Sequence, residues 1–282
     1  MRNFVFMLLS MTSFLWACTD APELQPVESL SVLPSDSMAV LFLRDAMNMD
    51  DENYPVNWVA SDTSTWDGLE FDTIVDPITS KKWLAVTSAT LYLVDKNRSI
   101  PGDIYYFEHL ENLKIYGCTG SKINGDIPRT VKSILIDRIN PEDRGYMELD
   151  EYREGDGELN ISKGYNIFER IEIHGVAMKS IKFKASPEAE IDLSDNLLEG
   201  AVPWAMCAFL SPVNLDNNRY ESFAQDRYLW RDAFRNDPQK YGCTVPYLRN
   251  NNITFFPEWV LQLNTWPEQS MKFIGNPGFV MP

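Results

Sequence analysis

Histidine and cysteine are scarce in this sequence, and their scarcity removes several classes of function. The 282 residues include only 2 His and 4 Cys, and no two cysteines have the close spacing of a zinc site. The G-x-S-x-G, H-E-x-x-H and P-loop motifs are also missing. The sequence therefore gives no reason to expect an enzyme, a bound metal or a cofactor.

Positive charge is scarce as well. The chain has 25 Lys and Arg against 41 Asp and Glu, which gives a formal net charge of -16. A protein that binds nucleic acid needs a basic face for the phosphates, so we expect no nucleic-acid partner. The same balance argues against attachment to anionic lipid through a basic patch.

Long apolar runs are missing apart from one, between Phe4 and Trp16. This run is too short for a transmembrane helix and is typical of an export signal. It ends in Leu15-Trp16-Ala17-Cys18, which resembles the bacterial lipobox. The resemblance implies that residues 1–18 are a lipoprotein signal and that Cys18 carries the lipid, so that acyl chains anchor the protein to a membrane. A signal cleaved near Ala17 without lipidation is the alternative.

Two segments follow the signal. Residues 19–34, with Pro22, Pro26 and Pro34, are predicted to be a tether. Residues 35–47 are predicted to form a helix, because Ser35 or Asp36 can cap its first free N–H groups. Its apolar residues are too numerous for a single stripe, so we expect the helix to be mostly covered.

The rest of the chain is organised around residues 191–203, which read I-D-L-S-D-N-L-L-E-G-A-V-P. Apolar residues alternate at Ile191 and Leu193 as in a strand, and Asn196 follows where the chain is expected to turn. Related patterns give strand starts at 91, 113, 134, 171, 191, 213, 246 and 271. Most of these starts are separated by about one repeat of a solenoid protein.

This pattern resembles the plant-type leucine-rich repeat, L-x-x-L-x-L-x-x-N-x-L-x-G-x-I-P, which also occurs in bacterial surface proteins. The resemblance implies an α/β fold, a right-handed, horseshoe-shaped solenoid of about eight repeats with a parallel concave sheet. Residues 35–85, with their helix, Trp58 and Trp66-Asp67-Gly68-Leu69, resemble the N-terminal cap of that family. The repeat domain then covers residues 86–282.

Two insertions interrupt the predicted repeats. Residues 140–166 are acidic, and alternation on both sides of Gly155 and Gly157 predicts a β-hairpin. We expect a solvated loop there and leave open whether it binds a cation. Residues 221–241 are predicted to contain an amphipathic helix. Cys207 and Cys243 are either buried thiols or a disulfide between neighbouring repeats.

The strand positions that face away from the core are the candidate ligand-binding site. Side chains alternate along a strand, so one column of such residues is predicted to run through Tyr92, Lys114, Glu172, Asp192 and Tyr247, and a second through Tyr116, Asp137, His174, Asp216 and Arg249. Acidic residues gather in the middle of both columns, and like charges on neighbouring strands repel. Either a partner offsets these charges, such as a basic protein segment, a cation or a sugar, or the face is solvated and binds no ligand.

These features together predict a non-enzymatic binding module that is lipid-anchored in the cell envelope, at the outer membrane or cell surface. The resemblance implies a protein partner. A carbohydrate-binding or nutrient-uptake accessory protein is the alternative, because tyrosines beside polar residues also suit sugars.

Overall fold

The computed structural model describes residues 30–47, 49, 58–59, 61–92, 102–117, 127–137, 158–161, 166–176, 178–224, 244–257 and 270–279. The chain divides into two units, Met1–Ser31 and Val32–Pro282, and the fold below is that of the second. Cys18 and most of the predicted tether lie outside the described residues. Among the residues that are described, no helix is both long and apolar enough to span a bilayer.

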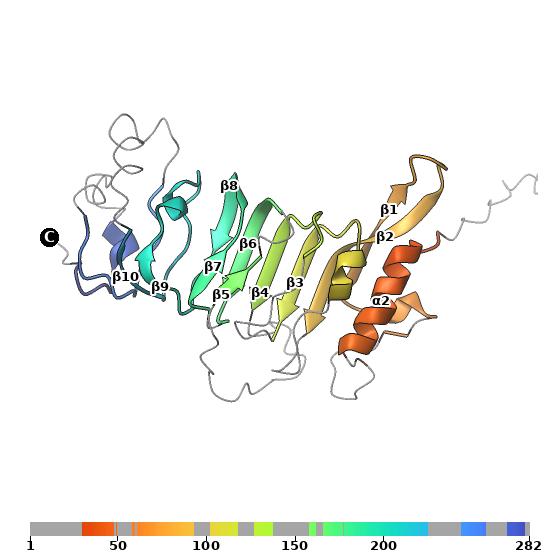
Figure 1. Ribbon diagram of the computed structural model, residues 1–282, viewed down its shortest axis with the longest axis horizontal. Coiled ribbons are helices and arrows are strands. Elements are labelled where there is room, and N and C mark those ends of the chain that lie inside the picture. Colours follow the sequence, from red (N-terminus) through yellow and green to blue (C-terminus); the bar gives the residue numbers. More distant parts are fainter. Residues whose placement is uncertain are drawn as a thin grey trace, which may run out of the picture. The chain divides into compact units, whose positions relative to one another are not determined.

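A six-stranded sheet forms the main element of this unit (Figure 1). In spatial order its strands are β1 (Leu69–Val75), β2 (Lys82–Tyr92), β3 (Asn112–Tyr116), β4 (Ser133–Asp137), β6 (Phe168–His174) and β8 (Ala185–Asp192). The first pair is antiparallel and every later pair is parallel. Isolated parallel bridges, from Asp192 to Asn214 and from Asn214 to Tyr247, continue the same ladder. The unit is therefore a β-solenoid with a parallel sheet.

Shorter elements form the other side of each turn. β5 (Glu158–Asn160) pairs with β7 (Ser180–Lys182), and β9 (Glu199–Val202) pairs with β10 (Arg219–Phe223), both in parallel. Four 3₁₀ turns complete the described elements: η1 (Thr63–Thr65), η2 (Gly102–Tyr106), η4 (Trp204–Cys207) and η5 (Ser270–Phe273). Because each turn needs its neighbours to bury its apolar edge, stability is shared along the stack.

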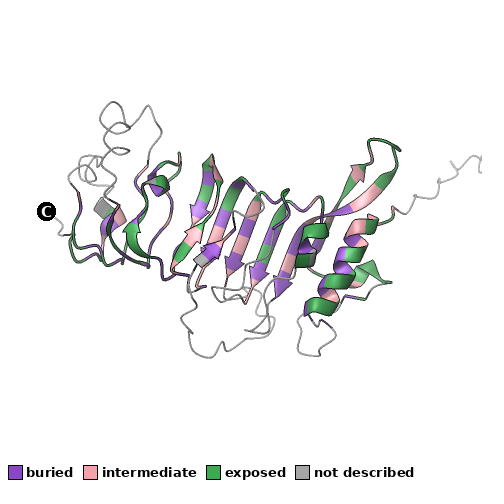
Figure 2. Ribbon diagram, viewed as in Figure 1, coloured by how far each residue is buried: buried purple, intermediate pink, exposed green. Residues whose placement is uncertain are grey.

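Alternating strand residues form the core between the two sides (Figure 2). Each turn has two successive inward-facing residues on this sheet, and the second of them is fully buried. These second residues are Leu91, Ile115, Ile136, Ile173, Leu193, Leu215 and Leu248, all 0% exposed. Stacking these side chains in register removes a continuous apolar strip from water, which is the main favourable term in folding.

A ladder of buried asparagines follows the sheet. Asn196, Asn218, Asn251 and Asn276 occupy the same position in four turns. The Asn218 side-chain amide donates to the carbonyls of Leu193 (2.9 Å) and Leu215 (3.1 Å), and its oxygen accepts the Leu198 N–H (3.0 Å). The other three repeat this arrangement. Each amide thus satisfies backbone groups of two adjacent turns, as buried polar groups require.

The residue just before each ladder asparagine, and the equivalent residue of two earlier turns, adopts a left-handed backbone conformation. The φ angles of Gly117, Gly175, Asp195, Asn217, Asn250 and Gly275 lie between 55° and 85°. Only Gly, and less readily Asn and Asp, adopts this region at low cost. The turn geometry therefore explains why these residue types recur beside the ladder.

Helix α2 (Pro34–Met47) coincides with the predicted helix, but two expectations about it are wrong. It is not covered all round, because Met38, Leu41 and Phe42 are exposed. Asp36 is not a helix cap, because it is fully buried and accepts the Val86 N–H of β2 at 2.7 Å. The carboxylate therefore joins α2 to the sheet.

The predicted register of the first repeat is wrong by two residues. Ala89 and Leu91 pair with Leu113 and Ile115, so Tyr92 lies beside Tyr116 and not beside Lys114. Ala89 is small but fully buried, so it fills the position that the sequence pattern assigned to a larger residue. At the other end, the predicted strand at 271 is the 3₁₀ turn η5, although the Lys272 carbonyl still accepts the Leu248 N–H.

The insertions are described only in part. Of residues 140–166, the strand β5 pairs in parallel with β7, while the first half of the predicted hairpin lies outside the described residues. Residues 221–223 belong to β10 and not to the predicted helix, whose remaining residues from 225 onward are outside the described part. Cys207 is a buried thiol and Cys243 is outside that part too.

Candidate functional site

The candidate site is the face of the parallel sheet that points away from the core, which we call the open face. Its first column is Thr90, Lys114, Leu135, Glu172, Asp192, Asn214 and Tyr247. Its second column is Tyr92, Tyr116, Asp137, His174, Ser194, Asp216 and Arg249. All ten residues predicted for the site lie on this face, with Tyr92 moved to the second column.

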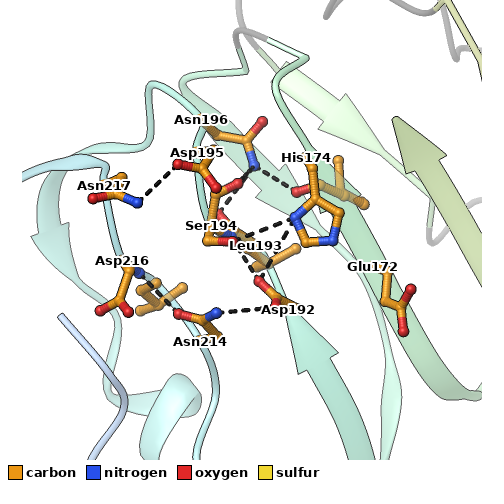
Figure 3. Close-up of polar contacts among 12 residues, drawn as sticks. Glu172, His174, Asp192, Leu193, Ser194, Asp195, Asn196, Asn214, Asp216 and Asn217 are labelled. Carbon is orange, nitrogen blue, oxygen red and sulfur yellow. Dashed lines mark hydrogen bonds and ion pairs between the residues drawn. The ribbon is translucent and has the colours of Figure 1, made fainter. Parts of the chain in front are cut away.

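The acidic residues of the open face have partners within the chain. Glu172 forms an ion pair with Arg170, whose Nε donates at 2.5 Å. Asp192 accepts the Ser194 N–H at 3.0 Å and the Asn214 side-chain amide at 2.9 Å (Figure 3). These contacts offset much of the repulsion that the sequence suggested. The acids therefore do not by themselves require an external partner, and binding at this face stays a prediction.

Asp216 is the most enclosed of these acids. Its side chain is 5% exposed, whereas that of its partner Arg249 is 53% exposed. Asp216 accepts the Arg249 backbone N–H at 2.6 Å and its Nε at 2.7 Å. This charge-assisted pair raises the pKa of the Arg249 guanidinium and leaves part of the guanidinium facing solvent. Arg249 is thus held in place while it stays accessible.

His174 and Ser194 form a contact that resembles half of a catalytic triad. Ser194 Oγ lies 3.3 Å from His174 Nδ1, and Asp192 Oδ1 lies 3.8 Å from that same nitrogen (Figure 3). A Ser-His-Asp triad places the serine and the carboxylate on opposite nitrogens of the imidazole. With both oxygens at Nδ1, the histidine cannot relay a proton from Ser194. The contacts of this cluster instead fix the positions of the His174, Asp192 and Ser194 side chains.

An exposed row of side chains runs beside the second column, and the sequence analysis missed it. The Asn217 side-chain amide donates to Asp195 at 2.8 Å, and that of Asn250 donates to Asn217 at 2.8 Å. We call Asp195, Asn217 and Asn250 the amide row. The available signal was the Asp or Asn that directly precedes three of the four ladder asparagines. The row ends at Gly275, where an added Cβ would lie 2.1 Å from the Asn250 side-chain oxygen.

The tyrosines of the site differ in accessibility. Tyr92 is buried and stacks on Tyr116 with ring centroids 5.8 Å apart. Tyr247 is exposed, and the Lys272 ammonium lies 4.8 Å from the centre of its ring. Burial lowers the pKa of Lys272, which also donates to the Val245 carbonyl at 2.9 Å. Tyr247 is therefore a better candidate for ligand contact than Tyr92.

Metal binding has no support in the part of the chain that the structure describes. No group of three or more His, Cys, Asp or Glu side chains converges there on a point that could hold an ion. Most of the acidic 140–166 insertion, where cation binding was left open, lies outside that part. What the open face offers chemically is a set of fixed hydrogen-bond donors and acceptors.

Comparisons with known proteins add little to this description. No family model and no curated protein matches the sequence. Among solved structures, the chain is similar to the leucine-rich-repeat ectodomain of the receptor kinase SOBIR1 from Arabidopsis thaliana. The match has 12% identity, a TM-score of 0.27, and covers 71% of this chain and 97% of that one. The chain's own strands and asparagine ladder therefore define its fold.

Proposed function

We propose that this protein is a leucine-rich-repeat binding module that recognises a protein partner through the open face of its sheet. The observation that carries the proposal is the fixed polar surface formed by Asp216, Arg249 and the amide row. Its side chains are held by contacts between turns, so little conformational freedom is lost when a partner binds. No described group is placed to act as a nucleophile or as its base, so we propose binding without catalysis.

The proposed solenoid has about eight repeats, counted from the sequence pattern. Its first turn is closed by α2 and the β1–β2 hairpin. Val32 bridges to Leu84, and Trp58 and Trp66 are buried in the same core. A solenoid end without such cover would expose apolar core to water.

We also propose that a lipid on Cys18 anchors the module in a bacterial cell envelope, at the outer membrane or cell surface. The support is the apolar run that ends at Leu15-Trp16-Ala17-Cys18. Cys18→Ser is the direct test, since mass spectrometry of the mature wild-type chain should show acyl groups that the variant lacks. Acylation of the variant, or an unmodified wild-type Cys18, would refute the anchor.

Binding is tested with two matched double variants of the full chain. Lys114→Glu/Tyr247→Ser changes two exposed residues of the open face, and Lys182→Glu/Phe255→Ser makes the same kinds of change on the opposite side of the turns. Both are screened with wild type against arrays of envelope and host-surface proteins. We expect the open-face variant alone to weaken binding, by about tenfold for a loss of about 1.4 kcal/mol. Equal binding by all three chains would contradict the proposal.

A glycan is the second candidate ligand. The observation that favours it is the exposed Tyr247 ring near Arg249 and the amide row, since sugars combine ring faces with many hydroxyl groups. A glycan array probed with the same chains separates the two candidates. Binding that resists protease treatment of the target and is lost after glycosidase treatment would replace the protein partner with a glycan.

A further inference from the structure

A cluster of exposed apolar residues lies on α2 and η2, away from the open face. Met38, Leu41 and Phe42 are 54%, 37% and 43% exposed, and Tyr105 and Tyr106 are 48% and 52% exposed. Their spacing of three and four residues puts the helix residues on one side of α2. The rings of Phe42 and Tyr106 lie 6.2 Å apart, which joins the two elements. We call these five residues the α2–η2 patch.

Contacts outside the patch also hold α2 in place. The opposite side of the helix buries Ala39, Val40 and Leu43, and Asp36 bonds to the Val86 N–H. Contiguous exposed apolar side chains of this size commonly mark a surface that another molecule covers. We therefore expect another molecule to cover the patch.

The position of α2 in the chain points to a membrane as that occupant. α2 begins at Pro34, and residues 19–33 separate it from the proposed lipid on Cys18. Fifteen residues reach at most about 50 Å when fully extended and less when relaxed. Among the described helices and strands, α2 comes first in the chain after the proposed anchor, so attachment of Cys18 holds the patch within reach of the lipid surface.

The chemistry of the patch agrees with this position. Tyrosine and phenylalanine favour the interface between lipid headgroups and acyl chains, where a ring can be buried while a hydroxyl stays wet. Arg44 is the one basic residue of α2 and η2, and it pairs with Asp45 at 3.1 Å, so the two elements offer no unpaired positive charge for anionic lipid. The whole chain carries a formal charge of -16, which opposes anionic lipid. The surface that fits is therefore zwitterionic.

We propose that the α2–η2 patch docks on the zwitterionic lipid surface of the membrane to which the protein is anchored. Docking would hold the solenoid at a set orientation and leave the open face accessible to its partner. This inference rests on the proposed anchor at Cys18 but not on the nature of the partner.

Photo-cross-linking tests the proposal directly. The full chain is attached to phosphatidylcholine vesicles that contain phosphatidylcholine with a diazirine in its acyl chain, and lipid adducts are mapped by mass spectrometry. If the mature chain carries no lipid, an N-terminal histidine tag and a nickel-chelating lipid provide the attachment. With this attachment, the absence of a lipid on Cys18 can be distinguished from the absence of contact between the patch and the membrane. We expect adducts on peptides that contain Met38, Phe42, Tyr105 and Tyr106.

Two variants complete the test. Leu41→Ser/Phe42→Ser should reduce adducts at Tyr105 and Tyr106 by about tenfold or more, because burial of these two side chains drives insertion. Leu210→Ser/Phe255→Ser, also at exposed positions, should leave those adducts unchanged. Matching circular dichroism spectra show that both variants fold. Wild-type adducts that are missing from α2 and η2, or spread evenly along the attached chain, would overturn the proposal and favour a protein as occupant.

Discussion

At the scale of single residues, a few buried polar side chains decide the fold. The ladder asparagines bond to backbone groups of two adjacent turns at the point where each strand ends. The single side chain of Asn218, for example, accepts one N–H and donates to three carbonyls. Because unpaired buried groups are costly, each ladder position accepts few alternatives.

Replacement of Asn218 by alanine should therefore destabilise the protein by about 2 kcal/mol, since the buried Leu198 N–H would lose its partner and the carbonyls of Leu193, Leu215 and Asp216 would each lose one of their donors. The neighbouring Asn217→Gly keeps the left-handed conformation and removes only exposed side-chain bonds, so it should cost about 0.5 kcal/mol or less. Urea unfolding gives both free energies. Similar costs for the two variants would show that the ladder is not a main source of stability.

Asp36 should make stability depend on pH in the direction opposite to most acids. Burial raises its pKa from 3.8 to about 6, so the folded state binds a proton more readily than the unfolded state between these values. This contribution therefore favours folding as the pH falls through about 6, and the effect is complete below the unfolded pKa near 3.8. His109 and Glu108 are the other charged groups that influence this carboxyl.

The measurement is the difference in unfolding free energy between wild type and Asp36→Asn, whose side chain can still accept the Val86 N–H. From pH 7 to pH 5, wild type should gain about 1 kcal/mol relative to this variant. Asp45→Asn, on the same helix but exposed, is the control and should show no such gain. A flat difference for Asp36→Asn over this range would mean that the carboxyl is not held in an apolar environment.

At the scale of elements, the left-handed residues join each strand to the next part of its turn. Gly275 has a φ of 85°, and an added Cβ would meet Asn250 at 2.1 Å for the side-chain oxygen and 3.1 Å for the backbone nitrogen. Gly200 has a similar φ of 81° but no atom within 4 Å of such a Cβ. A comparison of these two glycines therefore separates the cost of the left-handed backbone from the cost of steric crowding.

Gly200→Ala should cost about 1 kcal/mol, because only the left-handed conformation opposes it. Gly275→Ala should cost about 2 kcal/mol or more, because Asn250 must also move. Thermal unfolding of both variants provides the comparison. If Gly200→Ala were the more damaging change, packing between the last two turns would be looser than the structure shows.

The strands of the sheet show how much of the fold could be predicted from the sequence. The spacing of Ile191, Leu193 and Asn196 leaves few alternatives, and the predicted strand starts at 113, 134, 171 and 191 lie within observed strands. The first register was missed because Ala89 and Leu91 fit the pattern as well as Leu91 and Leu93 do. Local spacing cannot decide between two apolar pairs, whereas pairing with Leu113 and Ile115 can.

The site was predicted less completely than the fold. Alternation along the strands was enough to place Glu172, Asp192 and Asp216 on the open face. Their partners could not be predicted in the same way, because Arg249 lies 33 residues from Asp216 in the chain. Contacts between turns depend on which turns are neighbours and on side-chain reach, and neither is visible in a single repeat.

At the scale of the whole molecule, we propose different tasks for two surfaces. The open face would present fixed polar groups to a partner, and the α2–η2 patch would present apolar groups to lipid. The two surfaces share none of their residues, so changes in one should leave the other intact. Lys114→Glu/Tyr247→Ser should thus weaken partner binding and keep the adducts at Tyr105 and Tyr106.

Hydroxyl-radical footprinting of the chain with its bound partner tests the central claim most directly. The account predicts that Tyr116, His174 and Tyr247 of the open face become protected when the partner binds. Phe255 and Lys182, on the opposite side of the turns, should keep their reactivity. Protection of Phe255 and Lys182 with an unchanged open face would contradict the claim that the parallel sheet is the recognition surface.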